Sequence, residues 1–145
     1  MSGGVSSRRV FLDTNIFVYL LDRGDPAKQA RAESLVHQTI AEGSAVTSYQ
    51  VAQEFLSVAT RKFRSVMSSE EALAYVARLV LPCCEVNHPL LLYARALSIV
   101  EKTGWTFYDA LIVSAALEAG CEVLYTEDLQ TGRIFEGLEI RNPFA

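Results

Sequence analysis

The chain has 145 residues, of which 50% are apolar and 21% are charged, a composition typical of one globular domain and not of a disordered segment. No apolar stretch reaches the roughly 20 residues that cross a membrane, and no apolar signal region follows the polar N-terminus. We therefore expect a cytoplasmic protein with a flexible leader at residues 1–8 and a single domain at residues 9–145. The net charge of −4 excludes a general electrostatic attraction to nucleic acid. If the protein binds nucleic acid, a local basic patch or a bound cation must supply the attraction.

The first half of the sequence predicts short strands that alternate with helices. Pro26 suits the first turn of a helix and Gly43 suits the end of that helix, while Ser48 can cap the next one. In chain order we expect a strand at Val10–Leu12, a helix at 15–21, a turn at 22–26, a helix at 27–42, a strand at Ala45–Thr47 and a helix from Ser48 to about Phe63.

The second half continues the alternation. Ser68 and Glu71 form a capping box before the apolar stretch 72–81, and Pro82 is expected to stop that helix. We then expect a strand at Cys83–Val86, a helix at His88–Thr103 ended by Gly104, a helix at Thr106–Ala119 ended by Gly120, a strand at Cys121–Tyr125 and a further strand at Leu138–Ile140.

This order of elements predicts an α/β fold with three layers, in which a short parallel sheet of about four to five strands is flanked by helices. The expected strands are continuous apolar runs, as strands covered on both faces require. Ligands of such sheets bind outside the carboxyl ends of the strands, and this edge is where we look for a site.

Four acidic residues lie where that edge is expected. Asp13 interrupts the apolar run VFLDTNIFVYLL directly after the first strand, and Asp128 follows the strand that ends in LYTED. Glu54 lies about 60° from the centre of its helix's apolar stripe, so we expect it near the buried side. Asp109 begins the helix FYDALIVSAALEAG, which is apolar almost all round. A parallel sheet could gather all four carboxylates at one rim.

Each acid also has a purely structural interpretation. Asp13 suits the N-cap of the helix that follows it, and Asp109 lies three residues after Thr106, as in a variant capping box. Glu54 could be a half-exposed residue at the edge of its helix, and Asp128 could be an ordinary loop acid beside Glu127. Four unrelated caps and loops, however, need not share one sheet edge.

A cluster of carboxylates would bind a hard divalent cation. Carboxylates that lie close together repel one another, and a cation relieves that repulsion. The three cysteines form no CxxC pair and the two histidines lie far apart, so oxygen ligands alone remain, which favours Mg²⁺ or Mn²⁺. Such an ion can polarise a phosphoryl oxygen and activate water, which makes a phosphodiester the natural substrate.

These motifs, in their order, resemble the PIN-domain ribonucleases. The match rests on Asp13-Thr14-Asn15 after a strand, Glu54 in its helix, the run Tyr108-Asp109-Ala110-Leu111-Ile112 and the run Thr126-Glu127-Asp128, and it extends from Val10 to about Pro143. The short length is similar to that of VapC toxins of bacterial and archaeal toxin–antitoxin pairs.

The resemblance implies a metal-dependent endoribonuclease with a PIN-like domain. By position, Asp13, Glu54, Asp109 and Asp128 match the catalytic acids of the family, with Asp13, Asp109 and Asp128 as metal ligands. Asn15, Ser48 and Thr126 match polar positions that support the site. The resemblance also implies an RNA substrate, a homodimer and a cognate antitoxin that covers the site.

Two other features have both a functional and a structural interpretation. The cations Arg61, Lys62 and Arg64 could hold RNA phosphates, or could simply favour a helix C-terminus as solvated surface charges. Trp105 and Tyr108 could stack an unpaired base beside the metal, or could pack in the core or an interface.

The helix containing LLLYARALSIV is more apolar than one buried stripe needs, which suggests a dimer contact.

Two other functions compete with the ribonuclease. A PIN scaffold could bind metal without useful catalysis and act through a protein partner, although the presence of all four acids disfavours this. A receiver-type phosphoacceptor domain would need paired acids after the first strand and a lysine after a late one. The first strand here ends in a lone Asp13, and no lysine follows Lys102.

Overall fold

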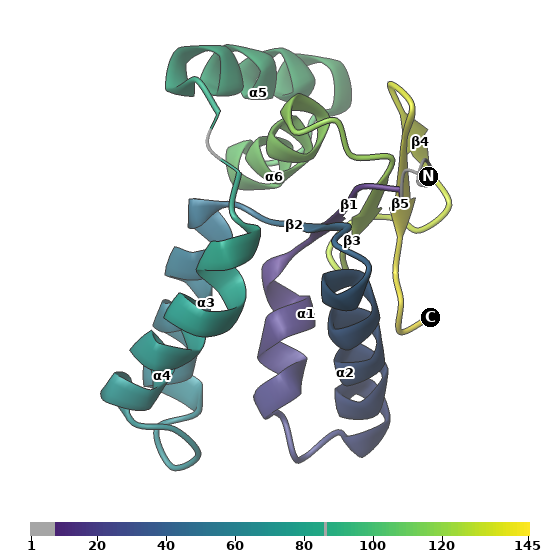
Figure 1. Cartoon of the computed structure of the whole chain (residues 1–145). Coiled ribbons are helices and arrows are strands. Elements are labelled where there is room, and N and C mark those ends of the chain that lie inside the picture. Colours follow the sequence, from purple (N-terminus) through teal and green to yellow (C-terminus); the bar gives the residue numbers. More distant parts are fainter. Residues whose placement is uncertain (1–7, 86) are drawn as a thin grey trace, which may run out of the picture.

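The computed structural model describes residues 8–85 and 87–145, which form a five-stranded sheet with helices on both sides (Figure 1). The strands are β1 (Val10–Leu12), β2 (Ala45–Val46), β3 (Val123–Tyr125), β4 (Ile134–Phe135) and β5 (Leu138–Arg141), in the order β2-β1-β3-β5-β4. The pairs β1–β2, β1–β3 and β3–β5 are parallel, and only β4 runs antiparallel to its neighbour.

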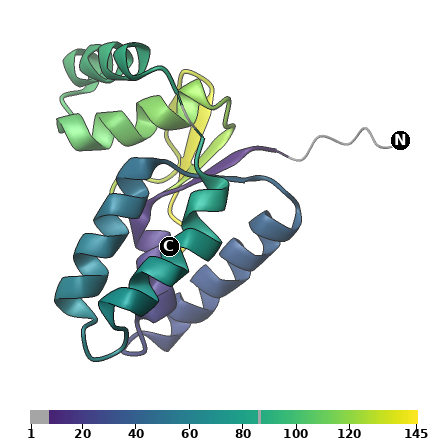
Figure 2. The same cartoon turned by 60° about the vertical axis from the view of Figure 1, so that its left-hand side comes forward.

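The helices form two groups, and the sheet lies between them. The helices are α1 (Thr14–Val18), α2 (Pro26–Ala41), α3 (Tyr49–Lys62), α4 (Ser69–Tyr75), α5 (Pro89–Thr103) and α6 (Phe107–Glu118). Figures 1 and 2 both show α5 and α6 packed together beside the strands in the upper part of the view, with α1 to α4 in the lower part. The predicted three-layer α/β fold is confirmed. No helix of the described residues has both the length and the apolar character needed to cross a bilayer.

Local signals explain where several helices begin and end. Ser68 accepts a hydrogen bond from the Glu71 N–H while the Glu71 carboxylate accepts one from the Ser68 N–H, which is the predicted capping box. Gly104 ends α5 with a φ of 77°, a left-handed conformation that residues with a Cβ adopt at a cost. Pro26 and Pro89 each lie in the first turn of a helix, where a missing N–H does no harm.

The core consists of the strands and the helix faces that cover them. Phe11 and Leu12 of β1 are fully buried, as is Leu124 of β3, so these strands are enclosed on both faces. Phe17 of α1 and Phe55 of α3 complete this contiguous cluster. Burying each of these side chains stabilises the fold by about 1.5–3 kcal/mol, and together they hold the carboxyl ends of β1 and β3 in place.

The expected strand at Cys83–Val86 is wrong. The helix that begins at α4 continues as a π-helical turn, Val76–Val80, and a 3₁₀ turn, Leu81–Cys83. Pro82 does not stop it, because the 3₁₀ turn places proline where no backbone donor is needed. Only a parallel bridge between Thr47 and Cys84 remains of the expected pairing, and Val86 lies outside the described residues.

The two ends of the chain also depart from the expectation. Most of the expected leader lies outside the described residues, but Arg8 is described and pairs with Glu122 at 3.3 Å. No strand was predicted at β4, which forms a hairpin with β5 through the two-residue turn Glu136-Gly137. All three cysteines are free thiols, and burial raises the pKa of Cys121 to about 12.

The hairpin turn makes the first testable prediction. Glu136 has a φ of 48° and Gly137 a φ of 86°, the pattern of a type I′ turn, which favours asparagine followed by glycine. We expect Glu136→Asn to raise the free energy of unfolding by about 0.5–1 kcal/mol, because asparagine tolerates this conformation better than glutamate does. Urea denaturation measures the change.

Two variants serve as controls for the turn. Glu136→Ala removes the charge but keeps the strained backbone, so it should not reproduce the gain. Gly137→Ala should lower stability by about 1 kcal/mol through backbone strain alone, because no other atom lies within 4 Å of the added Cβ. Equal unfolding midpoints for all variants would contradict the turn.

Candidate active site

Asp13 is a buried carboxylate at the carboxyl end of β1. It is 6% exposed and caps α1, and one carboxylate oxygen, Oδ1, accepts a hydrogen bond from the Thr14 N–H at 2.7 Å. The other oxygen, Oδ2, accepts a hydrogen bond from the Thr126 hydroxyl, also at 2.7 Å. Burial is the main cause that raises the pKa of Asp13 to about 7 against these two hydrogen bonds, and the charges of Asp128 and Glu54 contribute to the same rise.

Thr126 links the ends of two strands to the site. It is fully buried, and its N–H donates to the Arg141 carbonyl of β5. Its hydroxyl donates to Asp13 and accepts a hydrogen bond from the Asp128 N–H at 3.0 Å. The predicted supporting residue thus holds Asp13 and the Asp128 backbone together with one oxygen atom.

The structure distinguishes Asp128 from its neighbour Glu127. The Glu127 carboxylate accepts hydrogen bonds from Lys28 Nζ and the Tyr19 hydroxyl, both at 2.6 Å, and these outweigh burial and lower its pKa. Asp128 is exposed as a residue, but partial burial of its carboxyl group raises its pKa, as does the charge of Asp109, while a hydrogen bond from Asn15 opposes the shift. Glu127 also raises the pKa of Asp128, but only Asp128 of the two interacts with Asp13 and Asp109.

Glu54 and Asp109 reach the rim from helices. Glu54 is exposed, so the expectation that it lies near the buried side is wrong, yet its charge acts on Asp13. Gln50, one turn earlier on α3, donates from Nε2 to the Glu54 carboxylate at 2.8 Å and to the Tyr108 carbonyl at 3.4 Å. Asp109 is half-buried in the first turn of α6, where Thr106 accepts its N–H at 3.2 Å, the capping contact expected from the sequence.

The four acids therefore interact as one electrostatic group. Asp13 is coupled to Asp128 and Glu54, and Asp128 is coupled to Asp109. Within the described part of the chain, no three acidic, histidine or cysteine side chains lie close enough to hold a metal ion as they stand. Binding of an ion by three of these acids would therefore need at least one of the side chains to move.

The donor set fits a hard cation. Several buried oxygen atoms at the site have no hydrogen-bond partner: Thr14 Oγ1, Asn15 Oδ1 and Ser48 Oγ. Ser48 lies at the N-cap of α3, as predicted, but its side chain does not cap the helix. Unsatisfied buried oxygens beside a carboxylate with a raised pKa are groups that a cation or its water ligands can satisfy.

The remaining predicted residues lie elsewhere. Arg61, Lys62 and Arg64 are exposed at the C-terminal end of α3, and Arg61 follows Glu54 by about 10 Å along the helix axis. Trp105 packs on Phe135 at 5.6 Å and beneath Arg133, so its structural interpretation holds, whereas Tyr108 is 68% exposed beside the site.

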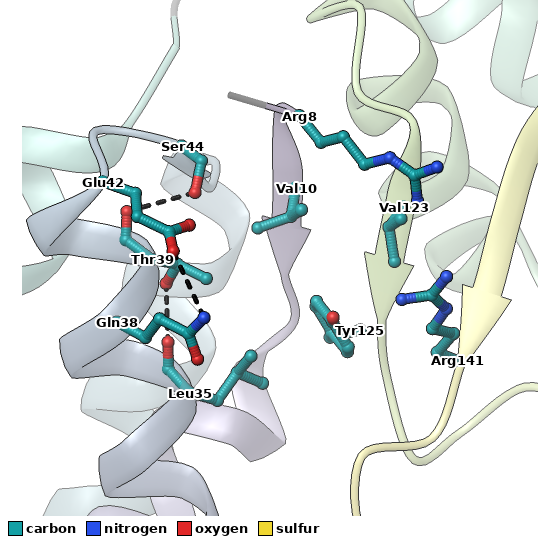
Figure 3. A pocket seen from close by; sticks show the side chains of 10 residues that line it. All are labelled: Arg8, Val10, Leu35, Gln38, Thr39, Glu42, Ser44, Val123, Tyr125 and Arg141. Atoms are coloured by element: carbon teal, nitrogen blue, oxygen red, sulfur yellow. Dashed lines mark hydrogen bonds between the residues drawn. The ribbon is translucent and has the colours of Figure 1, made fainter. Parts of the chain in front are cut away.

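A separate pocket of about 430 Å³ lies between α2 and the strands β1, β3 and β5 (Figure 3). It contains none of the predicted site residues. Its two arginines are already paired, Arg8 with Glu122 and Arg141 with Glu139. We therefore place the functional site at the acidic rim.

Sequence reasoning missed two parts of this site. Gln50 precedes Glu54 by four residues, a spacing that places both side chains on one helix face and could have suggested their contact. The network of Lys28, Tyr19 and Glu127 joins residues 9 to 108 positions apart, and no local pattern indicates it.

Comparisons with known proteins concern the fold of the chain. The model of the family described as PIN domain matches residues 10–134. A toxin–antitoxin complex from Klebsiella pneumoniae contains a similar structure, with a TM-score of 0.64 and 16% identity over 92% of this chain and 97% of that chain. No curated protein matches the sequence significantly.

Two further solved structures are similar in fold. VapC20 of Mycobacterium tuberculosis, described as a toxin that cleaves the sarcin–ricin loop, gives a TM-score of 0.58 and 22% identity over 82% of this chain and 89% of that chain. VapBC2 from Rickettsia felis, bound to a DNA fragment from its promoter, gives a TM-score of 0.56 and 20% identity over 92% and 97%. At these identities the likeness establishes the fold alone.

The buried carboxylate predicts an unusual stability profile. In the metal-free protein we expect Asp13→Asn to be more stable than the unchanged chain at pH 8, by on the order of 2–4 kcal/mol. The folded-state pKa of about 7 exceeds the usual value of 3.8, so the unchanged protein loses stability as the pH rises between these values. Asparagine does not titrate, so the difference should shrink as the pH falls toward 4.

Thermal unfolding in EDTA from pH 4 to pH 8 measures this difference. Glu127→Gln is the matched control, because it neutralises an adjacent acid that Lys28 stabilises, and it should lower the melting temperature at pH 8. A stability difference for Asp13→Asn that stays constant with pH would rule out the strained carboxylate.

Proposed function

This chain belongs to the PIN-domain family, and from that premise we propose that it is a divalent-metal-dependent endoribonuclease that acts as the toxin of a toxin–antitoxin pair. The observation that carries the proposal is the buried Asp13, whose pKa is raised by burial and by neighbouring acids. None of the described groups that shift its pKa is a cation. A divalent cation bound beside this carboxylate would offset the unfavourable burial of its negative charge.

We assign roles to the residues of the rim. Asp13, Asp109 and Asp128 would hold Mg²⁺ or Mn²⁺, and Glu54 would complete the catalytic acids. The ion supplies Lewis-acid chemistry, polarising a phosphoryl oxygen and lowering the pKa of water. Thr126 orients Asp13 and the Asp128 backbone, Asn15 hydrogen-bonds Asp128, and Ser48 offers a free hydroxyl.

We further propose that the protein forms a homodimer in the cytoplasm and binds a cognate antitoxin. The surface of α5 supports self-association, because Leu90, Leu91 and Leu97 are 69%, 58% and 57% exposed. Three exposed large aliphatic side chains on one helix are more than an isolated domain needs at its surface. The antitoxin proposal is supported by the fold shared with the Klebsiella and Rickettsia complexes.

The catalytic proposal predicts metal-dependent cleavage. Purified away from its co-expressed partner, the chain should cleave structured RNAs, including a sarcin–ricin hairpin, with Mn²⁺ or Mg²⁺ and not with EDTA. Asp13→Asn should lower the cleavage rate by about a hundredfold or more, because it removes a charged ligand. Gel analysis of end-labelled RNA measures the rate.

Two pairs of variants test the assigned roles. Thr126→Ser should keep most activity and Thr126→Val should lose about 10- to 100-fold, because only the hydroxyl matters. Asp128→Asn should reduce cleavage, whereas Glu127→Gln should keep it at temperatures where the variant is folded. Undiminished activity of Asp13→Asn would refute the proposal, and failure to cleave any RNA with Mn²⁺ would favour a non-catalytic scaffold.

The dimer proposal is tested by sedimentation. We expect the unchanged chain to sediment as a dimer at micromolar concentrations and Leu97→Glu to sediment as a monomer, since a buried unpaired charge opposes association. Leu73→Glu, on α4 and 60% exposed, is the control and should remain a dimer. A monomeric unchanged chain would contradict the assignment of α5.

A further inference from the structure

The two helix-borne acids of the rim come from different groups of helices. Glu54 lies in the second turn of α3, which packs on α1 and α4, and Asp109 lies in the first turn of α6, which packs on α5 and β3. Figures 1 and 2 show these two groups as separate parts of the molecule. A contact that joins α3 to α6 at the rim therefore sets how these two acids lie relative to each other.

Gln50 makes such a contact. Its side-chain nitrogen, Nε2, donates to the Glu54 carboxylate at 2.8 Å and to the Tyr108 carbonyl at 3.4 Å, and Tyr108 directly precedes Asp109. A carboxylate accepts hydrogen bonds only, so Nε2 and not the amide oxygen must face Glu54. The two N–H groups of one amide thus reach the acid on α3 and the backbone beside the acid on α6.

Helix stability alone does not account for a glutamine at this position. With Nε2 turned to Glu54, the amide oxygen Oε1 is buried without a hydrogen-bond partner. A side-chain pair four residues apart on one helix stabilises the helix by less than an unpaired buried oxygen costs. A leucine would fill a similar volume without that cost. Gln50 is therefore unfavourable for the fold unless its amide nitrogen has a use at the rim.

The contacts of Gln50 bear on all four acids. Glu54 is exposed, so its long side chain can turn into solvent unless a partner holds it. The charge of Glu54 acts on Asp13, and the charge of Asp109 acts on Asp128. An amide that holds the Glu54 carboxylate and the first turn of α6 together therefore also sets the field at the two acids of the strand ends.

We propose that Gln50 is a positioning residue, whose amide nitrogen holds Glu54 and the first turn of α6 at the spacing with which the acidic rim binds a divalent cation. The proposal rests on the metal-dependent function proposed above and adds a residue that contacts neither the ion nor the substrate. Gln50 acts through its hydrogen bonds to Glu54 and to the Tyr108 carbonyl beside Asp109. Without the amide, the Glu54 side chain is no longer held at the rim, and the ion binds less tightly.

Two measurements on Gln50→Leu test the proposal without relying on cleavage. The first is titration of the full chain with Mn²⁺, followed by calorimetry, and we expect the affinity to fall about 10-fold, as when a metal site loses an outer hydrogen-bond partner. The second is urea denaturation in EDTA. The midpoint should stay the same or rise, because leucine leaves no unpaired buried oxygen.

Two further variants serve as controls. Gln53→Leu makes the same chemical change at an exposed position of α3, and it should bind Mn²⁺ like the unchanged chain. Gln50→Leu is also made in a Glu54→Ala background, where the main acceptor of the amide is already missing. There it should change the Mn²⁺ affinity by less than about threefold, since a residue that acts through a partner loses its effect with that partner.

The outcomes separate this proposal from the proposed function. If Gln50→Leu weakens Mn²⁺ binding but the unchanged chain cleaves no RNA, the positioning role stands and the nuclease proposal fails. If RNA is cleaved and Gln50→Leu binds Mn²⁺ normally, the positioning role is overturned, and a lowered urea midpoint would then make Gln50 purely structural. A loss of affinity that persists in the Glu54→Ala background would also overturn it, whether or not the midpoint falls.

Discussion

The hydroxyl group of Thr126 is the point on which the geometry of the acidic rim depends. It donates to the Asp13 carboxylate and accepts from the Asp128 backbone, so it joins the acid that ends β1 to the acid that follows β3. The Asp13 N–H in turn donates to the Tyr125 carbonyl at 3.1 Å, directly before Thr126. Because the strands on both sides are closely packed, neither Asp13 nor the Asp128 backbone can shift without disturbing the sheet.

The rest of the rim is built differently. Glu54 and Asp109 project from helices, one exposed and the other half-buried, and their side chains are not held by the strands. Two of the acids are thus fixed at the strand ends, and the other two are carried by helices. This difference accounts for acids that interact electrostatically but do not form a complete set of metal ligands. The loop that carries Asp128 is also anchored from outside, because Lys28 binds Glu127 at 2.6 Å and lies over the rings of Tyr19 and Phe144.

Sequence reasoning succeeded where local chemistry decides the structure. The capping box at Ser68, the glycine that ends α5 and the apolar strands before Asp13 and Thr126 all follow from nearby residues. It failed where partners distant in the chain decide. The burial of Glu54 depends on how α3 packs, and the choice between Glu127 and Asp128 depends on Lys28, 99 residues earlier. The prediction of a strand at Cys83–Val86 failed because a π-helical turn and then a 3₁₀ turn, which contains Pro82, prolong the helix to Cys83.

The net charge of −4 restricts how such a chain can hold RNA. The exposed cations of the Arg61 region lie at the far end of α3, roughly a Debye length from Glu54 at physiological ionic strength, so salt screens most of their attraction at the rim. Under the proposed function, attraction of a phosphate comes from an ion bound by the acids, and the rim repels RNA until that ion is present. An ion held at the rim would therefore let an acidic protein bind RNA without a basic surface.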